Sequence, residues 1–253
     1  MAATLRLSRA PARDVLRARL VAAMTILTAW QALASSGLLF RDVVPSLWHI
    51  AAAVIATLVD PVFYTNLGVT GFEFAVAILL GGVAGTIVGL LLGSSRFLAA
   101  AYERWVHYLA PTPKIIFFPV LLLLFGADSG SKIAMGALSC GFPVAISVAA
   151  GVREVRPVLI RVGHSFRANA WQMATKIYLP AVREPLLNGL RLGFGVAAIG
   201  VLLAETKLSK AGIGFLVMDA YRRFDMPGMY ALLILVILLV AAVNTAMIRL
   251  GRH

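Results

Sequence analysis

The stretch FAVAILLGGVAGTIVGLLLGSS, residues 74–95, carries no charged residue and places glycine at every fourth position. A helix needs about 20 apolar residues to cross the hydrocarbon core of a bilayer, so this stretch predicts a membrane span. Gly81, Gly85, Gly89 and Gly93 fall on one face of that helix. Small residues let helices approach closely in lipid, so this face predicts tight packing on another helix, in this chain or in a second copy.

The composition of the whole chain agrees with a membrane location. Its 253 residues are 60% hydrophobic and only 13% charged, whereas a soluble domain carries about 25% charged residues. The net charge of +12 would raise nucleic-acid binding in a soluble protein. Here the basic residues flank apolar runs, so membrane orientation is the simpler interpretation. A single cysteine, Cys140, excludes an intrachain disulfide.

Further charge-free runs predict an all-α membrane protein, a six-helix transmembrane bundle. We expect a basic N-terminal segment at 1–19 and one membrane domain at 20–250. The predicted spans are about 20–40, 72–95, 111–127, 132–152, 186–205 and 227–248, and the loop at 153–183 joins the fourth to the fifth. The third span is short, and the fifth contains Arg191.

Two apolar runs leave alternatives open. Residues 43–59 contain Pro45 and His49 and predict an interfacial helix, with a seventh span as the alternative. The first run follows several arginines and ends near Ala32-x-Ala34, which resembles a signal-peptide cleavage site. Its apolar stretch is longer than a usual signal peptide has, which favours a retained span.

Lysine and arginine predict the orientation. With the N-terminus inside, most of the basic residues lie in the inside segments, as the positive-inside rule requires. The richest of these segments is the loop at 153–183. Both ends of the chain are then expected in the cytoplasm.

That loop contains FRANAWQMATKIYLP, residues 166–180. Asn169 is a good N-cap, and Gln172 stands where a capping box needs it. We expect a helix from Ala170 to about Tyr178, with a break at Pro180. A short helix with an aromatic face suits docking into a partner's groove. An alternative places Trp171 and Tyr178 at the lipid headgroups.

This loop resembles the EAA loop of ABC importer permeases. Ala168, Asn169, Trp171, Gln172 and Leu179-Pro180 fall in register with the family's loop. The spans around it, NGLRLGFGVAAIGVLLAE (188–205) and PTPKIIFFPVLLLLFG (111–126), resemble those of the branch that imports nitrate, sulfonates and taurine. The resemblance covers about residues 68–244.

The resemblance implies a bacterial inner-membrane permease that binds no cofactor itself, because ATP is bound by partner subunits. The implied partners are a second permease copy (a homodimer, or a heterodimer with a different permease), two cytoplasmic ATPases and an external binding protein. The implied ATPase-coupling residues are Arg161, Arg167, Ala168, Asn169, Trp171, Gln172, Lys176, Tyr178 and Pro180. The chain departs from the family at Arg161, where the family has glutamate, and at Arg167, where it has glycine. Val162 and Gly163 replace the two alanines, so the usual ATPase contact is expected to be rewired.

Polar residues inside the spans are candidates for a transport path. Ionisable groups are costly at membrane depth, so Glu205 is either a gate, a helix-end group or a solvated residue. Ser139 and Asn244 could line a path, although serine commonly bonds a carbonyl of its own helix. Neither a nucleophile–base pair nor a metal-ligand motif is visible, so we expect no catalysis in this chain. A secondary transporter or channel is the alternative function, but it should show internal repeats or buried acidic residues.

Overall fold

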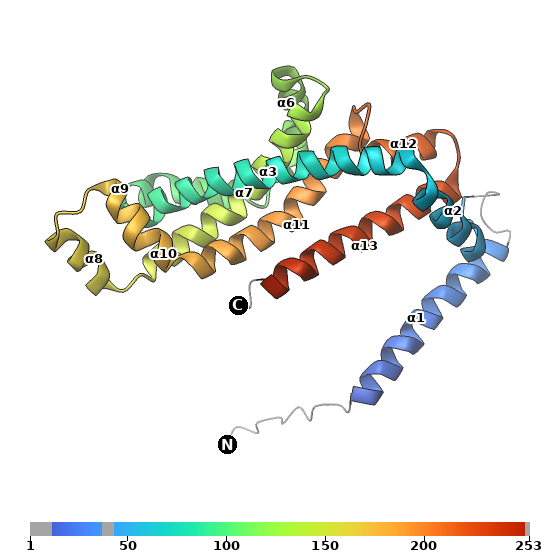
Figure 1. Cartoon of the computed structure of the whole chain (residues 1–253), viewed down its shortest axis with the longest axis horizontal. Helices are drawn as coiled ribbons and strands as arrows, with labels where there is room; N and C mark the ends of the chain where they lie inside the picture. Colours follow the sequence, from blue (N-terminus) through green and yellow to red (C-terminus); the bar gives the residue numbers. More distant parts are fainter. Residues whose placement is uncertain (1–11, 37–42, 251–253) are drawn as a thin grey trace.

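The computed structural model describes residues 12–36 and 43–250, which form helices and loops without a β-strand. The longer helices are α1 (Ala12–Ser35), α2 (Leu47–Val59), α3 (Pro61–Ser94), α7 (Ser129–Arg153), α11 (Arg183–Lys207), α12 (Ile213–Arg222) and α13 (Met226–Leu250). The shorter ones are α4 (Arg96–Leu98), the π-helix η1 (Ala99–Glu103), α5 (Arg104–Leu109), the 3₁₀-helix η2 (Lys114–Phe117), α6 (Phe118–Phe125), α8 (Pro157–Ser165), α9 (Ala170–Met173), the π-helix η3 (Ala174–Tyr178) and α10 (Leu179–Ala181). Figure 1 shows their arrangement.

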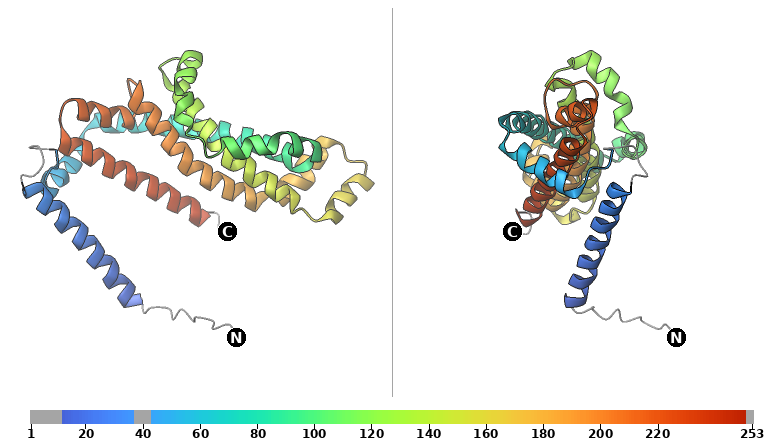
Figure 2. Two further views of the ribbon diagram at one scale, coloured as in Figure 1. Left: turned by 180° about the vertical axis from the view of Figure 1, so that it is seen from behind. Right: turned by 90° about the vertical axis from the view of Figure 1, so that its right-hand side faces the viewer.

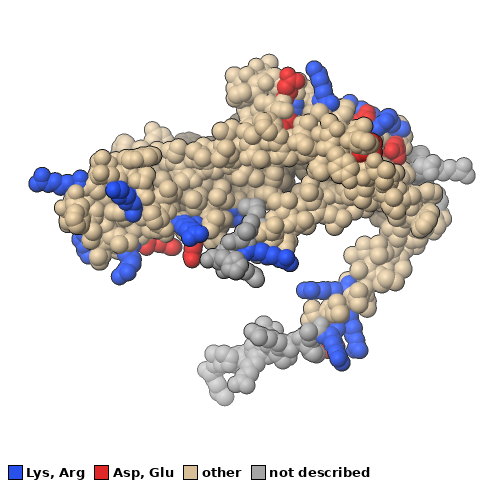
Figure 3. Space-filling view, in the orientation of Figure 1, with Lys and Arg blue, Asp and Glu red and all other residues tan. Residues whose placement is uncertain are grey.

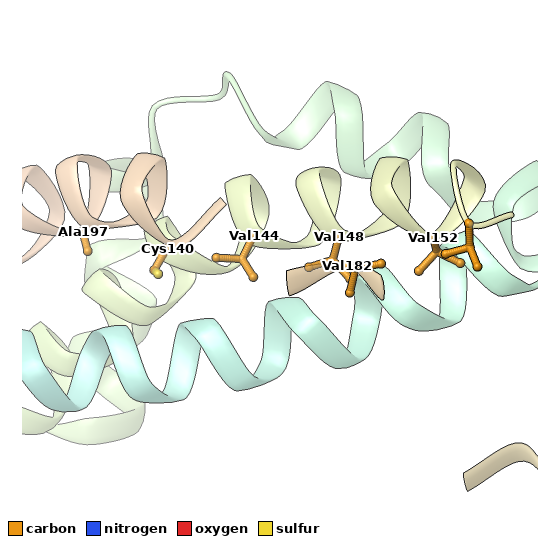
Figure 4. Close-up of a cluster of buried hydrophobic side chains, with 7 residues drawn as sticks. Cys140, Val144, Val148, Val152, Val182 and Ala197 are labelled. Carbon is orange, nitrogen blue, oxygen red and sulfur yellow. The ribbon is translucent and has the colours of Figure 1, made fainter. Parts of the chain in front are cut away.

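Helix α7 is the centre of the bundle, because it packs against both α3 and α11. Its buried face repeats with a spacing of four residues. Figure 4 shows this core, which consists of Cys140, Val144, Val148 and Val152 of α7 together with Val155, Val182 and Ala197. The regular spacing of small and β-branched side chains lets α7 lie along its neighbours for most of its length.

Gly81, Gly85, Gly89 and Gly93 of α3 all face α7. A Cβ atom added at Gly81 would lie 2.5 Å from the carbonyl oxygen of Ala137, and one at Gly85 would lie 2.5 Å from that of Gly141. Gly89 and Gly93 meet the next two turns of α7 in the same way. Of the two partners that the sequence left open, the structure therefore places a helix of the same chain against the glycine face.

Five of the described helices are long and apolar enough to cross a membrane, and a sixth span results if one bent pair is counted as a span. The five are α1, α3, α7, α11 and α13. Helix α3 has 34 residues and is therefore roughly 51 Å long, well beyond the ~30 Å hydrocarbon core. The six-helix transmembrane fold predicted from the charge-free runs is present, with the bent pair as its third span.

The third predicted span is not one straight helix. Helices over 96–109 and 114–125 form the bent pair, and they meet at 97°. Pro111 and Pro113 lie at the break, where each lacks a backbone N–H. The expected span at 111–127 therefore corresponds to η2 and α6 together, and only Phe118–Phe125 is α-helical.

Two boundaries also differ from the expected ones. Helix α1 begins at Ala12, inside the segment predicted to precede the first span. Helix α3 begins at Pro61 instead of residue 72, because Asp60 accepts a hydrogen bond from the backbone N–H of Val62 at 2.9 Å and caps the helix. The expected helix within 43–59 is α2, which is too short to span a bilayer.

Helix α1 leaves the rest of the bundle at an angle (Figure 2). Its membrane-length window has no buried residue. Contacts near its C-terminal end attach it: the indole Nε1 of Trp30 donates to the carbonyl oxygen of Pro45 at 3.1 Å, and its ring meets that of Tyr230 edge to face. Helix α1 thus presents an apolar surface along nearly its whole length.

Candidate functional site

The loop between α7 and α11 starts and ends at the same place on the bundle. Gly151, at the end of α7, lies against Pro185 and Val182 at the start of α11. A Cβ atom at Gly151 would lie 2.5 Å from Cγ of Pro185, and Val182 is fully buried. Arg153 is held by Glu103 of η1: its Nη2 donates to the carboxylate Oε2 of Glu103, and the two atoms are 2.6 Å apart. The loop is therefore attached to the bundle at a close-packed junction, and Ile160, Ile177 and Tyr178 add contacts with the valine core.

The first half of the loop is α8, which the sequence reading did not predict. Pro157 opens it, a position where proline's missing N–H costs nothing. Its end forms a Schellman motif: the N–H of Ala168 donates to the carbonyl of Gly163 at 3.0 Å, and that of Arg167 to His164 at 2.9 Å. This motif needs a left-handed residue, and Arg167 supplies it with φ of 52°. Arg167 stands where the resemblance expects glycine, so the backbone of the family's loop is kept although the residue is not.

The second half of the loop begins with the predicted cap. Asn169 Oδ1 accepts from the N–H of Gln172 at 2.8 Å, and Gln172 Oε1 accepts from the N–H of Asn169 at 3.0 Å. Both halves of the capping box are thus formed, and the helix begins at Ala170 as expected.

The end of this helix differs from the expectation. Pro180 does not break it, because the chain continues as η3 and α10 to Ala181 and turns only at Val182. The π-helical turn of η3 ends just before Leu179 and Pro180. Hydrogen bonds of π type span five residues, so they alter the spacing of donors and acceptors ahead of the proline.

The two halves of the loop pack on each other at Gly163. A Cβ atom there would clash with the side chains of Met173 and Ile177. Gly163 and Met173 are buried, which clamps α8 against the capped helix. Gly163 occupies one of the two positions where the resemblance expects alanine, and here the close approach requires the smaller residue.

The exposed surface of the loop combines two aromatic residues, Phe166 and Trp171, with several charges. Trp171 is 75% exposed, whereas Tyr178, expected on the same docking face, packs inward against the valine core. Arg161, Arg167 and Lys176 are exposed, as Pro180 is, while Ala168 is half-buried. Figure 3 shows that basic side chains gather at this end of the molecule.

A second polar cluster lies at the other end of α11 and contains Glu205. This side chain is 1% exposed, which rules out the solvated alternative. Its Oε2 accepts from the N–H of Gly214 at 2.6 Å, and its Oε1 from the hydroxyl of Thr70 at 2.7 Å. Thr70 in turn accepts from the N–H of Ile213 at 2.8 Å. Glu205 thus satisfies the free N–H groups at the start of α12 and acts at a helix end.

Neighbouring buried groups extend this cluster. Asn66 Oδ1 accepts from the N–H of Gly212 at 2.7 Å, and Gly212 has φ of 106°, which favours glycine. Glu73 and Lys132 are both 1% exposed and lie close to Glu205. The Lys132 ammonium also donates to the carbonyls of Ala127 and Asp128. The cluster joins α3, α7, α11 and α12 at one end of the bundle.

The three predicted pathway residues do not meet. Ser139 is buried against Gly200 and donates to the carbonyl of Met135 at 2.8 Å, the bond expected for a helical serine. Glu205 belongs to the cluster above, and Asn244 is half-buried on α13.

Sequence reasoning missed several residues that shape these sites. These residues are Asn66, Thr70 and Glu73. The three bonds that Asn66 and Thr70 form with α11 and the start of α12 each span more than 130 positions, so no local pattern joins the partners. In the sequence, Gly163 stood out only because the resembled family has alanine at this position. Helix α12 was not predicted from the sequence either.

The chain is thus a helical bundle with several candidate membrane spans and a capped loop that projects from one end. A profile of one family, described as binding-protein-dependent transport system inner membrane component, matches residues 77–253. The chain belongs to this family, whose members are the inner-membrane permeases of ABC importers.

Two named relatives and one solved structure illustrate the similarity. The chain is 28% identical to a putative aliphatic sulfonates transport permease protein of Bacillus subtilis over 89% of its own length and 81% of the relative's. It is 29% identical to the taurine transport system permease protein of Escherichia coli, over 64% and 58% of the two lengths. Its fold matches a chain of the inward-facing MetNI methionine ABC transporter with a TM-score of 0.61 and 21% identity, covering 81% of this chain and 96% of that one.

Proposed function

We propose that the loop of residues 153–183 transmits ATP-driven motion of partner ATPases to the spans of this permease, which carries a small anion. The observation that supports this most is the geometry of the loop. Both of its ends meet at the Gly151–Val182–Pro185 junction, and its two helices are clamped at Gly163. A push on the exposed Trp171 surface would therefore reach the ends of α7 and α11 together.

Charge suggests the character of the ATPase surface. The loop carries Arg161, Arg167 and Lys176 on its exposed side, and the family's glutamate is absent. Opposite charges across an interface guide partners and set their register. The groove that receives this loop is accordingly proposed to be acidic, which compensates for the reversal at Arg161.

The remaining assignments follow from the family. A second permease, identical or not, completes the path, two ATPases bind ATP at the cytoplasmic face, and an external binding protein delivers the solute. Both chain ends lie in the cytoplasm, on the side of the loop. Relatives named for sulfonates, taurine and nitrate support an anionic solute.

Replacement of Trp171 tests the coupling role. The tagged chain and the variant Trp171→Ser are purified from host membranes in mild detergent, and vanadate-sensitive ATP hydrolysis in each preparation is measured. Removing a central aromatic anchor commonly costs 2 kcal/mol or more of binding, so the hydrolysis retained should fall at least tenfold.

Trp105→Ser is the matched control, since Trp105 is 64% exposed on α5, outside the loop. It should retain the ATPase. Equal retention in both variants would refute the coupling role, and solute transport by the lone chain in liposomes without ATP would favour a secondary transporter.

A further inference from the structure

Lys114 is a cation placed at the break of a membrane span. It begins η2 at the 97° bend of the bent pair, directly after Pro113. Its ammonium donates to the carbonyl of Ala110 at 2.6 Å and, weakly, to that of Thr112 at 3.4 Å, and it lies 5.1 Å from the ring centre of Phe142. None of the ion pairs formed by the described residues includes Lys114. A charged group at membrane depth is costly. The partners of Lys114 are two backbone carbonyls and an aromatic face, so no counter-charge among the described residues balances it.

The residues around Lys114 line a partly open cavity of about 320 Å³. One wall is the Pro111–Lys114 turn, and the other is formed by α7 and α11. The volume lies at the lower end of the range for small-molecule sites, which begins at about 300 Å³. Its aliphatic walls consist of Ile115, Met135, Val196, Ile199 and Leu203.

Gly200 and Ser139 also line the cavity, where α11 packs closely on α7. A Cβ atom at Gly200 would lie 2.7 Å from Ser139 Oγ. The hydroxyl of Ser139 already donates to Met135, and that of Thr112 donates to Tyr108 at 3.0 Å. The ammonium of Lys114 has three donors and is therefore the group on this cavity best able to hold an anion.

We propose that this cavity binds a short-chain organic monoanion, with its acidic head at Lys114 and its aliphatic tail along the α7 and α11 walls. This proposal rests on the proposed function, of which it names the solute class and a binding site within the permease. A bare inorganic anion would leave the aliphatic walls uncovered, whereas a neutral molecule would leave the cation unpaired. The two features together select a solute that has one charge and a tail.

Binding is measurable without an ATPase. The full chain is placed in lipid nanodiscs, and saturation-transfer NMR records binding of ethanesulfonate, of nitrate, and of ethyl methyl sulfone as a neutral analogue. We expect ethanesulfonate to bind and to be displaced only poorly by either of the others. Equal binding of the neutral sulfone would overturn the proposal.

The variant Lys114→Gln should weaken ethanesulfonate binding at least tenfold, while Lys114→Arg retains most of it. Lys207→Gln is the matched control, because Lys207 is an exposed cation at the end of α11, outside the cavity. Undiminished binding by Lys114→Gln would refute the assignment.

Ile199→Phe tests the cavity while leaving Lys114 intact. Ile199 lines the wall but is 60% exposed, so the larger ring narrows the cavity without straining a closed core. Binding of butanesulfonate should fall more than that of ethanesulfonate, and an equal effect on both would contradict the placement of the tail. If the chain retains an ATPase but binds no ethanesulfonate, the coupling proposal stands and the anion site is refuted. If it binds ethanesulfonate but retains no ATPase, the anion site stands and the coupling proposal is refuted.

Discussion

At the scale of single residues, Arg167 shows how a fold can keep a backbone shape after losing the residue that favours it. Its φ of 52° lies in the left-handed region, which costs a residue with a Cβ atom about 1–2 kcal/mol. Two Schellman hydrogen bonds hold it there. Phe224 repeats the arrangement at the end of α12, with φ of 58°.

Arg167→Gly should therefore stabilise the protein. Relief of the left-handed strain, less the greater freedom of glycine in the unfolded chain, leaves a gain of about 0.5–1 kcal/mol. The melting temperature in detergent should rise by about 1–4 °C. Arg161→Gly removes the same charge from the interior of α8 and should lower it instead, because glycine costs about 1 kcal/mol in a helix. If the melting temperature shifts in the same direction in both variants, the loss of charge, and not the backbone conformation, determines the change in stability.

The residue scale also shows where sequence reasoning ends. Asn169 and Gln172 are three positions apart, so their mutual capping could be predicted. Glu205 could be recognised as unusual at membrane depth, but its role depended on Thr70, 135 positions away. Local patterns contain no information about such a partner, which only the packing of α3 beside α11 brings near.

At the scale of helices, the α3–α7 contact depends on glycines that leave no room for a methyl group. Gly85→Ala would place Cβ 2.5 Å from the carbonyl oxygen of Gly141 and 2.8 Å from Cβ of Val144. The backbones must then separate, at a cost of about 1–3 kcal/mol. Thermal unfolding in mild detergent should show a melting temperature several degrees lower.

Gly195→Ala on α11 is the control for this prediction. Nothing lies within 4 Å of a Cβ atom there, and alanine favours a helix over glycine. Its melting temperature should stay unchanged or rise. A loss equal to that of Gly85→Ala would indicate that helix flexibility, and not close packing, is what the glycines provide.

The sequence predicted helices well where a long charge-free run or a capping box marked them, as in α7 and in the helix that begins at Ala170. The effect of proline on the helices was predicted less well. Pro180 was expected to end a helix that continues to Ala181. Pro111 and Pro113, at the start of the span expected at 111–127, lie at a 97° bend between two helices, which was not predicted. The cost of a proline depends on whether nearby turns can change their hydrogen bonding, and that depends on tertiary packing.

At the scale of the whole molecule, α11 separates two chemically different ends. Its 25 residues give a length of about 38 Å, enough to cross the bilayer. At its start lies the basic loop with Trp171, and at its end the buried cluster of Glu205. If the loop meets cytoplasmic ATPases, the Glu205 end must face outward.

Cysteine labelling tests this orientation, since the one native thiol, that of Cys140, is fully buried and supplies a blank. Ser165, in the loop that precedes α11, and Lys210, just after α11, are both exposed, so each is changed to cysteine separately. A membrane-impermeant maleimide added to intact spheroplasts should label Lys210→Cys and not Ser165→Cys, while lysed membranes should label both. The opposite pattern would place the basic loop outside the cell, where no ATPase could reach Trp171, and the excess of lysine and arginine in that loop would then lie on the side that the positive-inside rule disfavours.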